Sequence, residues 1–340
     1  MKKFLIPAFL AVVALANAEE LKLSNYILNT TFSGDARVRY DVKNYDTNSS
    51  SQTDSDYFST RFRLNTTTKI NDNFSFGTRI KLQKSPIGNA VDSSTNKGIN
   101  ADISIERLYM DYKIGNNTIR VGRMGSPIYI LSDMLIDTNV EGIAYSTKFN
   151  DTQLKAGYLL KNSADSTETS DENSIIYAQG VQTFKLAENK LLVEASVYLE
   201  DKGNSTSTKA QDIKAFTLGG EYTLALNNTI EMAQIKGQYI TSDADNDNVG
   251  YTAGLVIGSK AIKQQGTWQV AVDYKKVEKS AFPYISNDTV LDQEVTKIAA
   301  TTYVAPNTNL ELAYEIHDYI SSSNSTKNYD LSYVALNYTF

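Results

Sequence analysis

The sequence predicts an all-β protein, a transmembrane antiparallel up-and-down β-barrel of about 16 strands. Three observations predict it. Uncharged and charged residues alternate with a period of two over long segments, short turns alternate with longer polar loops, and the chain ends on an apolar strand with a terminal aromatic residue. A leader segment precedes the region that carries these features.

The leader has the pattern of an export signal. Two lysines follow the initiating Met, an apolar run covers 4–15, and an Ala-Asn-Ala motif at 16–18 supplies the small residues that a signal peptidase requires. The apolar run is shorter than the roughly 20 residues that a membrane-spanning helix needs. We therefore expect a signal peptide at 1–18 and the outer-membrane barrel at 19–340.

The composition excludes several classes of function. The chain has no cysteine, which removes disulfide and thiol chemistry, and only one histidine. It has no nucleotide-binding loop, Cys-His cluster or basic nucleic-acid-binding stretch. We expect no cofactor, no metal and no nucleic-acid partner. The mean hydropathy of −0.34 fits a barrel as well as a soluble protein, because only every second residue of a membrane strand faces lipid.

The first three expected strands show the alternation most clearly. In 32–42, 58–70 and 74–83, the alternate positions that begin with phenylalanine carry no charge, whereas the positions between them carry nine charges. These segments exceed an ordinary strand of roughly 5–6 residues and suit a tilted crossing of a bilayer, which takes roughly 9–11. A two-sheet sandwich also alternates, but its dry core would reject arginines. We expect water on the charged side and lipid on the uncharged side.

Alternation continues along the chain, with three exceptions. It recurs at 154–161, 191–200, 268–275 and 310–317. It loses phase at 102–114, 174–186 and 229–241, where we expect β-bulges, each of which adds one residue to a strand.

Short turns and longer loops alternate without exception. Turns rich in Asn, Asp and Gly are expected near 70–73, 115–117, 150–152, 187–190, 225–228, 260–265 and 305–309. Longer polar loops are expected near 43–56, 85–101, 125–138, 162–173, 203–211, 242–248, 279–292 and 321–328. Seven turns and eight loops require 16 strands. An even count puts both termini on one side, and a barrel of this size encloses an aqueous channel.

The last strand carries its own signal. Val334, Leu336, Tyr338 and Phe340 form one apolar face that ends on the terminal residue. The sequence from Asn337 to Phe340 resembles the closing strand of outer-membrane barrels, whose final phenylalanine is read by the barrel assembly machinery. The resemblance implies that Leu336, Tyr338 and Phe340 form an assembly signal.

Two motifs around the third long loop resemble one family. They are Val121–Pro127, which contains a Gly-Arg element, and Asp137–Tyr145. They resemble the Gram-negative general-diffusion porins, in which such residues bracket a loop folded into the barrel, although Met124 replaces the commoner Gln. The loop 128–135 is more apolar than the others, as suits an infolded third loop, although a loop that only covers a subunit boundary would have the same composition.

This resemblance implies a passive porin for small hydrophilic solutes and ions in the bacterial outer membrane. It also implies a homotrimer in contact with lipid and lipopolysaccharide. The abundance of Lys, Asn, Ser and Asp is similar to that of porins from AT-rich epsilonproteobacteria.

All eight arginines lie in the first five expected strands. Five of them share the water-facing side by strand parity, and consecutive strands are neighbours in a barrel. We call this set the arginine arc: Arg37, Arg39, Arg61, Arg63 and Arg79. An outward arginine at the bilayer midplane would cost roughly 2–4 kcal/mol, which favours the inward assignment.

The arc predicts a pore constriction with a transverse field. Asp133, Asp137 and Glu141, on or beside the third loop, would face the arc, which Arg120 extends. Guanidinium groups stay charged and rigid, and opposed charges across a narrow opening order water and filter ions. The alternative is that the arginines only solvate and brace the wall.

Weaker signals point elsewhere. The Asp-x-Asp-x-Asp segment 243–247 has calcium-loop spacing but lacks the expected Gly and Glu, so we expect a solvated loop. Asp46–Ser50 matches an acceptor sequence for bacterial N-glycosylation. His317 faces the lumen without a triad partner, and Glu311 and Glu315 lie roughly 13 Å apart on one strand.

Three other functions stay open. A substrate-specific channel would show saturable flux. A barrel enzyme would need a Ser, His or Asp constellation, which a single histidine disfavours. A structural or adhesive barrel would not conduct.

Overall fold

The computed structural model describes residues 29–46, 54–87, 102–128, 139–160, 174–201, 213–226, 229–260, 262–283, 291–321 and 328–340. The expected signal peptide, Asp133, Asp137 and all of the predicted glycosylation segment except Asp46 lie outside these residues. In the part of the chain that is described, no helix is long and apolar enough to cross a membrane.

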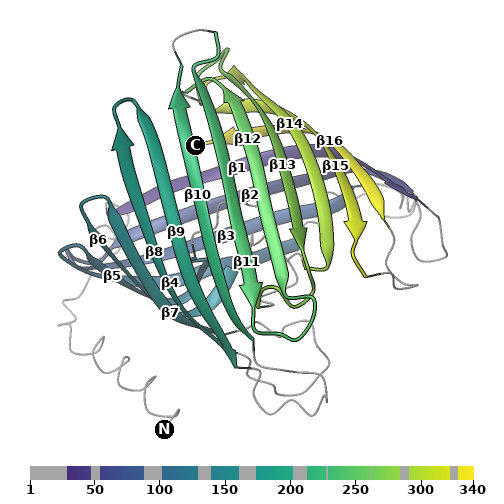
Figure 1. The fold of residues 1–340 in the computed structure, drawn as a ribbon. Coiled ribbons are helices and arrows are strands. Elements are labelled where there is room, and N and C mark those ends of the chain that lie inside the picture. Colours follow the sequence, from purple (N-terminus) through teal and green to yellow (C-terminus); the bar gives the residue numbers. More distant parts are fainter. Residues whose placement is uncertain are drawn as a thin grey trace.

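Sixteen antiparallel strands form one closed barrel, which confirms the predicted fold (Figure 1). They are β1 (Thr30–Tyr45), β2 (Ser55–Lys69), β3 (Phe74–Ile87), β4 (Asp102–Ile114), β5 (Asn117–Gly125), β6 (Asn139–Phe149), β7 (Thr152–Leu160), β8 (Ser174–Leu186), β9 (Asn189–Asp201), β10 (Lys214–Ala225), β11 (Met232–Ser242), β12 (Val249–Gly258), β13 (Trp268–Val277), β14 (Gln293–Ala305), β15 (Thr308–Tyr319) and β16 (Tyr329–Thr339). Each strand pairs with its neighbours in sequence, and β16 closes the barrel on β1. Every connection falls where the alternation of turns and loops predicts it.

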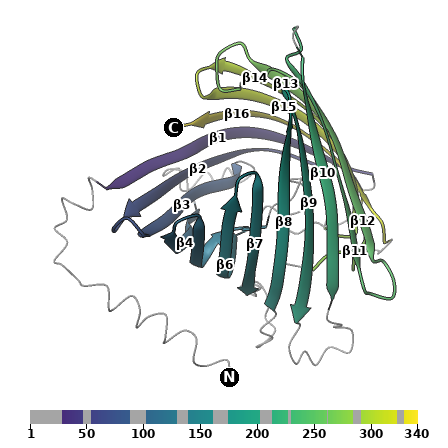
Figure 2. The same cartoon turned by 60° about the vertical axis from the view of Figure 1, so that its left-hand side comes forward.

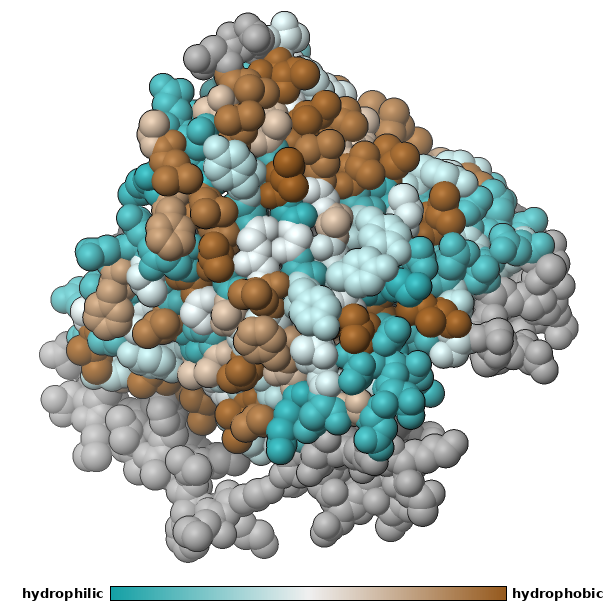
Figure 3. Space-filling view, in the orientation of Figure 1, coloured by the Kyte–Doolittle hydropathy of each residue, from teal (hydrophilic) through white to brown (hydrophobic). Residues whose placement is uncertain are grey.

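The two faces of each strand explain why these segments form a barrel. In β1 and β2 the phenylalanine-bearing positions point outward: Phe32 is 57% exposed, Phe58 51% and Val38 49%. The charged residues between them point inward. Figure 3 shows apolar side chains spread over the outer face of the molecule. Because these side chains are not covered by a second sheet, their natural environment is lipid.

The wall of the barrel is not equally high all round. β5 and β7 have nine residues each, whereas β8 and β9 have 13. Figure 2 shows β6 and β7 as a low part of the wall beside the tall strands β8 to β10. The low part borders the third long loop, which connects β5 to β6.

One of the three expected bulges is confirmed. The register of β3 and β4 shifts between Arg79 and Ile80, so Glu106 of β4 has no register partner on β3. The bulges expected at 174–186 and 229–241 are wrong, because β8 and β11 pair with both neighbours without a shift. Their alternation looks broken in the sequence because some inward side chains, such as Tyr177 and Ile240, are apolar and buried.

The barrel closes through the last residue of the chain. The Gly34 amide donates to the Phe340 carbonyl over 2.9 Å, and the Phe340 amide donates to the Gly34 carbonyl over 3.1 Å. The Phe340 ring stacks on Phe62 and on Tyr338, with centroids 5.9 Å apart in both cases. A Cβ on Gly34 would lie 2.5 Å from the Phe340 ring, so this approach needs glycine. The terminal aromatic residue therefore packs at the barrel seam.

Candidate functional site

The arginine arc lies on the inner face of three adjacent strands. Arg37 of β1 pairs in register with Arg61 of β2, and Arg63 pairs with Lys81 of β3. Arg79 of β3 lies next along the same face, opposite Asn65. The structure therefore brings all five predicted arginines to one continuous part of the lumen wall.

Two carboxylates hold three of these arginines. Asp35 accepts hydrogen bonds from Arg61 Nη2 over 3.0 Å and from Arg63 Nε over 2.7 Å. Asp41 is fully buried and binds Arg39 through Nε at 3.0 Å and Nη2 at 2.8 Å. Charge-assisted, bidentate contacts of this kind fix the orientation of a guanidinium group. Most of the arc is therefore rigid.

The charged wall continues onto β4 and β5. The bulge residue Glu106 lies 2.8 Å from Lys81 Nζ and 4.0 Å from Arg79 Nη1. Farther along, Arg120 donates to both oxygens of Asp111, over 2.6 and 2.8 Å. Arg120 therefore lies on the same inner wall, two strands from Arg79.

Arg107 also belongs to this wall, and strand parity did not assign it. It pairs in register with Arg79, and its Nε donates to Asn139 Oδ1 over 2.8 Å. Its guanidinium group fills the space where a Cβ on Gly125 would lie, 2.6 Å from Cζ. The bulge in β4 shifts the phase by one residue, so the loss of alternation at 102–114 was the signal for this position.

Glu141 does not face the arc. In β6 it shares its face with Ile143 and Tyr145, which are both 39% exposed on the outside of the barrel. It forms an ion pair with Arg123 Nη1 at 3.0 Å, on the neighbouring strand. The predicted place of Glu141 at the constriction is therefore wrong, because the parity of β6 turns it outward.

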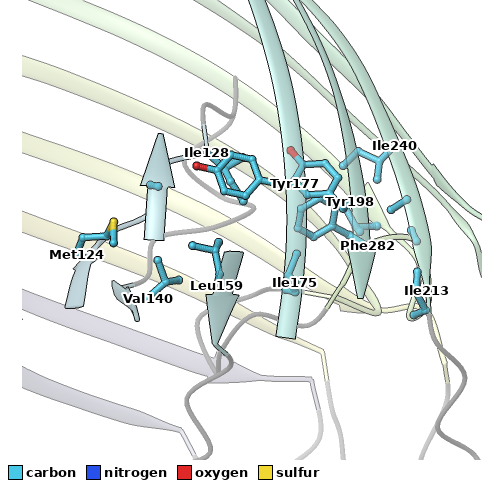
Figure 4. Close-up of a cluster of buried hydrophobic side chains, with 14 residues drawn as sticks. Met124, Ile128, Val140, Leu159, Ile175, Tyr177, Tyr198, Ile213, Ile240 and Phe282 are labelled. Carbon is cyan, nitrogen blue, oxygen red and sulfur yellow. The ribbon is translucent and has the colours of Figure 1, made fainter. Parts of the chain in front are cut away.

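Part of the lumen is filled by what we call the inner apolar cluster. Its members are Met124, Ile128, Val140, Ala144, Leu159, Ile175, Tyr177, Tyr198, Ile213, Ala215, Ile240, Val277, Ala281 and Phe282. They come from β5 to β13 and mostly from the ends of strands that carry the long loops. Figure 4 shows the Tyr177, Tyr198 and Phe282 rings close to one another.

Three loops contribute to this cluster, and Ile213 comes from the loop between β9 and β10. Phe282, in the loop after β13, is fully buried, and its ring meets Tyr198 edge-on at a centroid distance of 4.8 Å. Ile128, in the third loop, is 7% exposed. The third loop therefore starts inward, as predicted. The inward fold of the loop after β13 was not predicted.

A buried carboxylate lies on the same side of the lumen. Glu194 of β9 is fully buried. Ser196 donates to it over 2.9 Å, Gln238 over 2.5 Å, and Gln179 and Thr217 over 3.4 Å each. A buried charge requires such compensation. Because the donors come from β8 to β11, Glu194 ties the inner faces of four strands together.

A third group of charges lies on β14 to β16, beside the closing seam. Lys297 Nζ is 3.2 Å from Glu315 and donates to the Tyr333 hydroxyl over 2.8 Å. His317 Nε2 lies 2.9 Å from Glu315, so the one histidine contacts this network through Glu315. The Arg39 guanidinium stacks 4.8 Å from the Tyr333 ring centroid, which connects this group to the arc.

The weaker sequence signals are placed as follows. Asp243 Oδ1 accepts a hydrogen bond from the Lys214 amide over 2.7 Å, at the start of the loop 243–248. Glu311 accepts a hydrogen bond from the Tyr333 hydroxyl over 2.8 Å. The structure thus joins Glu311 and Glu315 to one network through Tyr333 and Lys297.

Known proteins share both the sequence pattern and the fold. A profile of the family described as Gram-negative porin matches residues 6–340. The structure is similar to OprB of Pseudomonas putida, with a TM-score of 0.65 and 9% identity over 92% of this chain and 94% of that one. It is also similar to OccAB3 of Acinetobacter baumannii (TM-score 0.58, 10% identity, 92% and 99% covered). OpdQ of Pseudomonas aeruginosa gives a TM-score of 0.53 at 15% identity, with 93% and 99% covered. No curated protein sequence matches the chain.

Proposed function

Because the chain belongs to the Gram-negative porin family, we propose that its charged lumen wall lines the path by which small hydrophilic solutes and ions diffuse across the outer membrane. Family membership and the 16-stranded barrel support an outer-membrane channel rather than an enzyme. The observation that carries the proposal is the division of each strand of β1 to β3 into an apolar outer face and a charged inner face. Only an aqueous lumen suits that many inward charges.

We further propose that the arc forms one side of the pore constriction. The bidentate contacts of Asp41 and Asp111 hold Arg39 and Arg120 in fixed orientations, which a stable field requires. The acidic side of the field is proposed for Asp133 and Asp137 of the third loop. Glu141 is left out of this proposal, since it faces outward.

Export and assembly are part of the same proposal. A signal peptide at 1–18 would direct the chain to the barrel assembly machinery, and the mature barrel would contact lipid and lipopolysaccharide. The outward pair of Arg123 and Glu141, near the loop ends of β5 and β6, supports the proposed homotrimer, because charges on the lipid-facing side of a barrel are destabilising. Against a second copy of the chain, the same pair would be covered by protein.

Single-channel recording tests the central claim. Purified, refolded protein added to a planar lipid bilayer in KCl should produce discrete conductance steps that grow with salt concentration. Uncharged sugars in a liposome swelling assay should enter at rates that fall with size and rise linearly with concentration. Saturable sugar flux would favour a substrate-specific channel instead, and a bilayer without steps would refute the channel.

Replacement of Phe340 tests the assembly signal. Phe340→Ala keeps the backbone hydrogen bonds at the seam but removes the stacked ring, so we expect folding in detergent micelles and a several-fold lower amount in the outer membrane. Heat-dependent gel mobility of membrane fractions measures the folded amount. Phe184→Ala, which removes an outward ring from β8, is the matched control. Equal amounts of the two variants would contradict the signal.

A further inference from the structure

His317 is the one histidine of the chain, and it lies on the inner face of β15. Its neighbour Ile316 is 38% exposed on the outside of the barrel, so strand alternation turns His317 toward the lumen. The His317 side chain is 12% exposed. Histidine is the side chain whose ordinary pKa, about 6.5, places its change of charge between about pH 5 and 8. The lumen wall thus contains a group that can change its charge near neutral pH.

An aromatic ring and a carboxylate hold His317 in place. Its ring stacks on Tyr329, the register partner on β16, with centroids 4.3 Å apart and planes 13° apart. Its Nε2 atom lies 2.9 Å from Glu315 Oε2. Because a carboxylate accepts hydrogen bonds, Nε2 carries the proton of the neutral ring. A second proton must therefore bind at Nδ1.

The Nδ1 atom of His317 is buried, and no described residue forms a hydrogen bond with it. In the neutral ring this atom is an unpaired acceptor, whereas in the protonated ring it is a donor. Buried N–H groups in proteins are nearly always hydrogen-bonded, so the protonated ring needs an acceptor for Nδ1. Because the side chain is partly exposed, rotation of its ring can bring Nδ1 to the water of the lumen. Protonation therefore adds a positive charge to the wall and turns the ring away from Tyr329.

The charged groups around His317 come from the strands on both sides of it. Those on the inner faces of β13, β14, β15 and β1 are Lys275, Lys297, Glu311, Glu315 and Lys43. Lys297 shares Glu315 with His317, at 3.2 Å. Lys43 Nζ lies 3.6 Å from the centroid of the Tyr329 ring and comes from the strand on the other side of β16. A protonated His317 would thus join three lysines, which the two glutamates offset only in part.

We propose that protonation of His317 makes the ion preference of the channel depend on pH, with anions favoured more strongly in acid. A positive charge on the wall attracts Cl⁻ and repels K⁺, so both effects lower the permeability of K⁺ relative to Cl⁻. For ions that pass about 10 Å from one added charge, the two effects together amount to about threefold. The inference rests on the proposed channel and adds a residue that tunes its ion preference.

Reversal potentials across a KCl gradient, measured at about pH 8 and about pH 5.5, test the proposal. The permeability ratio of the wild type should fall by about threefold between the two values. His317→Gln cannot take up the proton, so its ratio should change by less than about 1.5-fold. An arginine can stack on Tyr329, bind Glu315 and stay charged at both pH values. His317→Arg should therefore show, already at about pH 8, the ratio of the acidic wild type.

An NMR titration of the wild type gives a second readout that depends on no variant. Because the chain has one histidine, isotope-labelled protein without a histidine tag contains a single imidazole side chain. Its resonances in detergent micelles should shift between about pH 8 and about pH 5.5. Resonances that stay fixed would show that His317 does not take up a proton and would overturn the proposal.

The electrical results separate this proposal from the channel itself. A conducting wild type with the same ratio at both pH values would overturn the role of His317 and leave the channel intact. An equal shift in wild type and His317→Gln would do the same, because another inner group, such as the buried Lys275, would then carry the response. A wild type that conducts nothing would overturn both.

Discussion

Neutralising Arg61 and Arg63 together should shift the ion preference of the channel toward cations. Asp35 accepts hydrogen bonds from both arginines and lies with them on the lumen face. In the double variant Arg61→Gln/Arg63→Gln, the three positions change from a net charge of about +1 to about −1, and a half-buried carboxylate remains without its partners. We expect the permeability of K⁺ relative to Cl⁻ to rise on the order of tenfold, equal to about 1.4 kcal/mol. Reversal potentials across a KCl gradient measure this ratio.

The control for this variant removes the same charge from the other face. Arg123 lies opposite the outward Glu141, and Lys276 forms an ion pair with Glu294 at 3.4 Å, on the outward parity of β13. Arg123→Gln/Lys276→Gln should leave the reversal potential nearly unchanged, because neither side chain reaches the lumen. If both double variants shift the potential equally, or neither does, the arc does not set ion preference and only braces the wall.

The second large effect is expected for Phe282→Ala. The Phe282 ring is fully buried against Tyr198 and anchors the loop after β13 inside the barrel. Loss of a buried phenylalanine costs about 3–5 kcal/mol, which should lower the free energy of unfolding in detergent by a comparable amount. Once the anchor is gone, the loop can leave the lumen. We therefore expect a larger single-channel conductance with an unchanged sign of ion preference.

Phe216→Ala separates these two consequences. Phe216 is 39% exposed and points outward from β10, so it has the same side chain on the lipid face. Its replacement should cost less stability and leave conductance unchanged. An unchanged conductance in Phe282→Ala, together with the expected loss of stability, would mean that the loop packs on the wall without narrowing the pore.

The lumen thus has two unlike sides. The inner apolar cluster and the buried Glu194 occupy the side formed by β5 to β13, where loops cover the wall. Most charged groups on β14 to β16 and on β1 to β5 stay partly exposed, with side-chain exposures of 20% for Arg61 and 23% for Lys297, although Asp41 and Asp111 are buried. Hydrophilic solutes should therefore pass along the charged side, where the arc lies.

The strands, their connections and the lumen face of β1 to β3 follow from local sequence patterns. Period-two alternation and the chemistry of short turns act between residues close in the chain, so they can be read without the fold. The same holds for the arginine arc, since one face of each strand carries the charges and the other carries phenylalanines. The apolar face of the last strand likewise predicted that it closes the barrel. The hydrogen bonds between Gly34 and Phe340 then place the end of this strand at the seam.

Which inward residues are covered and which outward residues are charged depends on contacts between distant parts of the chain. The Tyr198 ring packs against Phe282, which lies about 80 residues away in sequence, so no local pattern contains the contact. Glu141 follows a long loop, so the alternation of earlier strands does not tell which face of β6 points inward. Both faces of β6 are largely apolar, so the sequence of β6 does not tell it either. Arg37 and Arg61 become neighbours on the lumen wall because the register of β1 and β2 pairs them. Side-chain alternation is a local property of a strand, whereas burial and pairing depend on which distant segments meet.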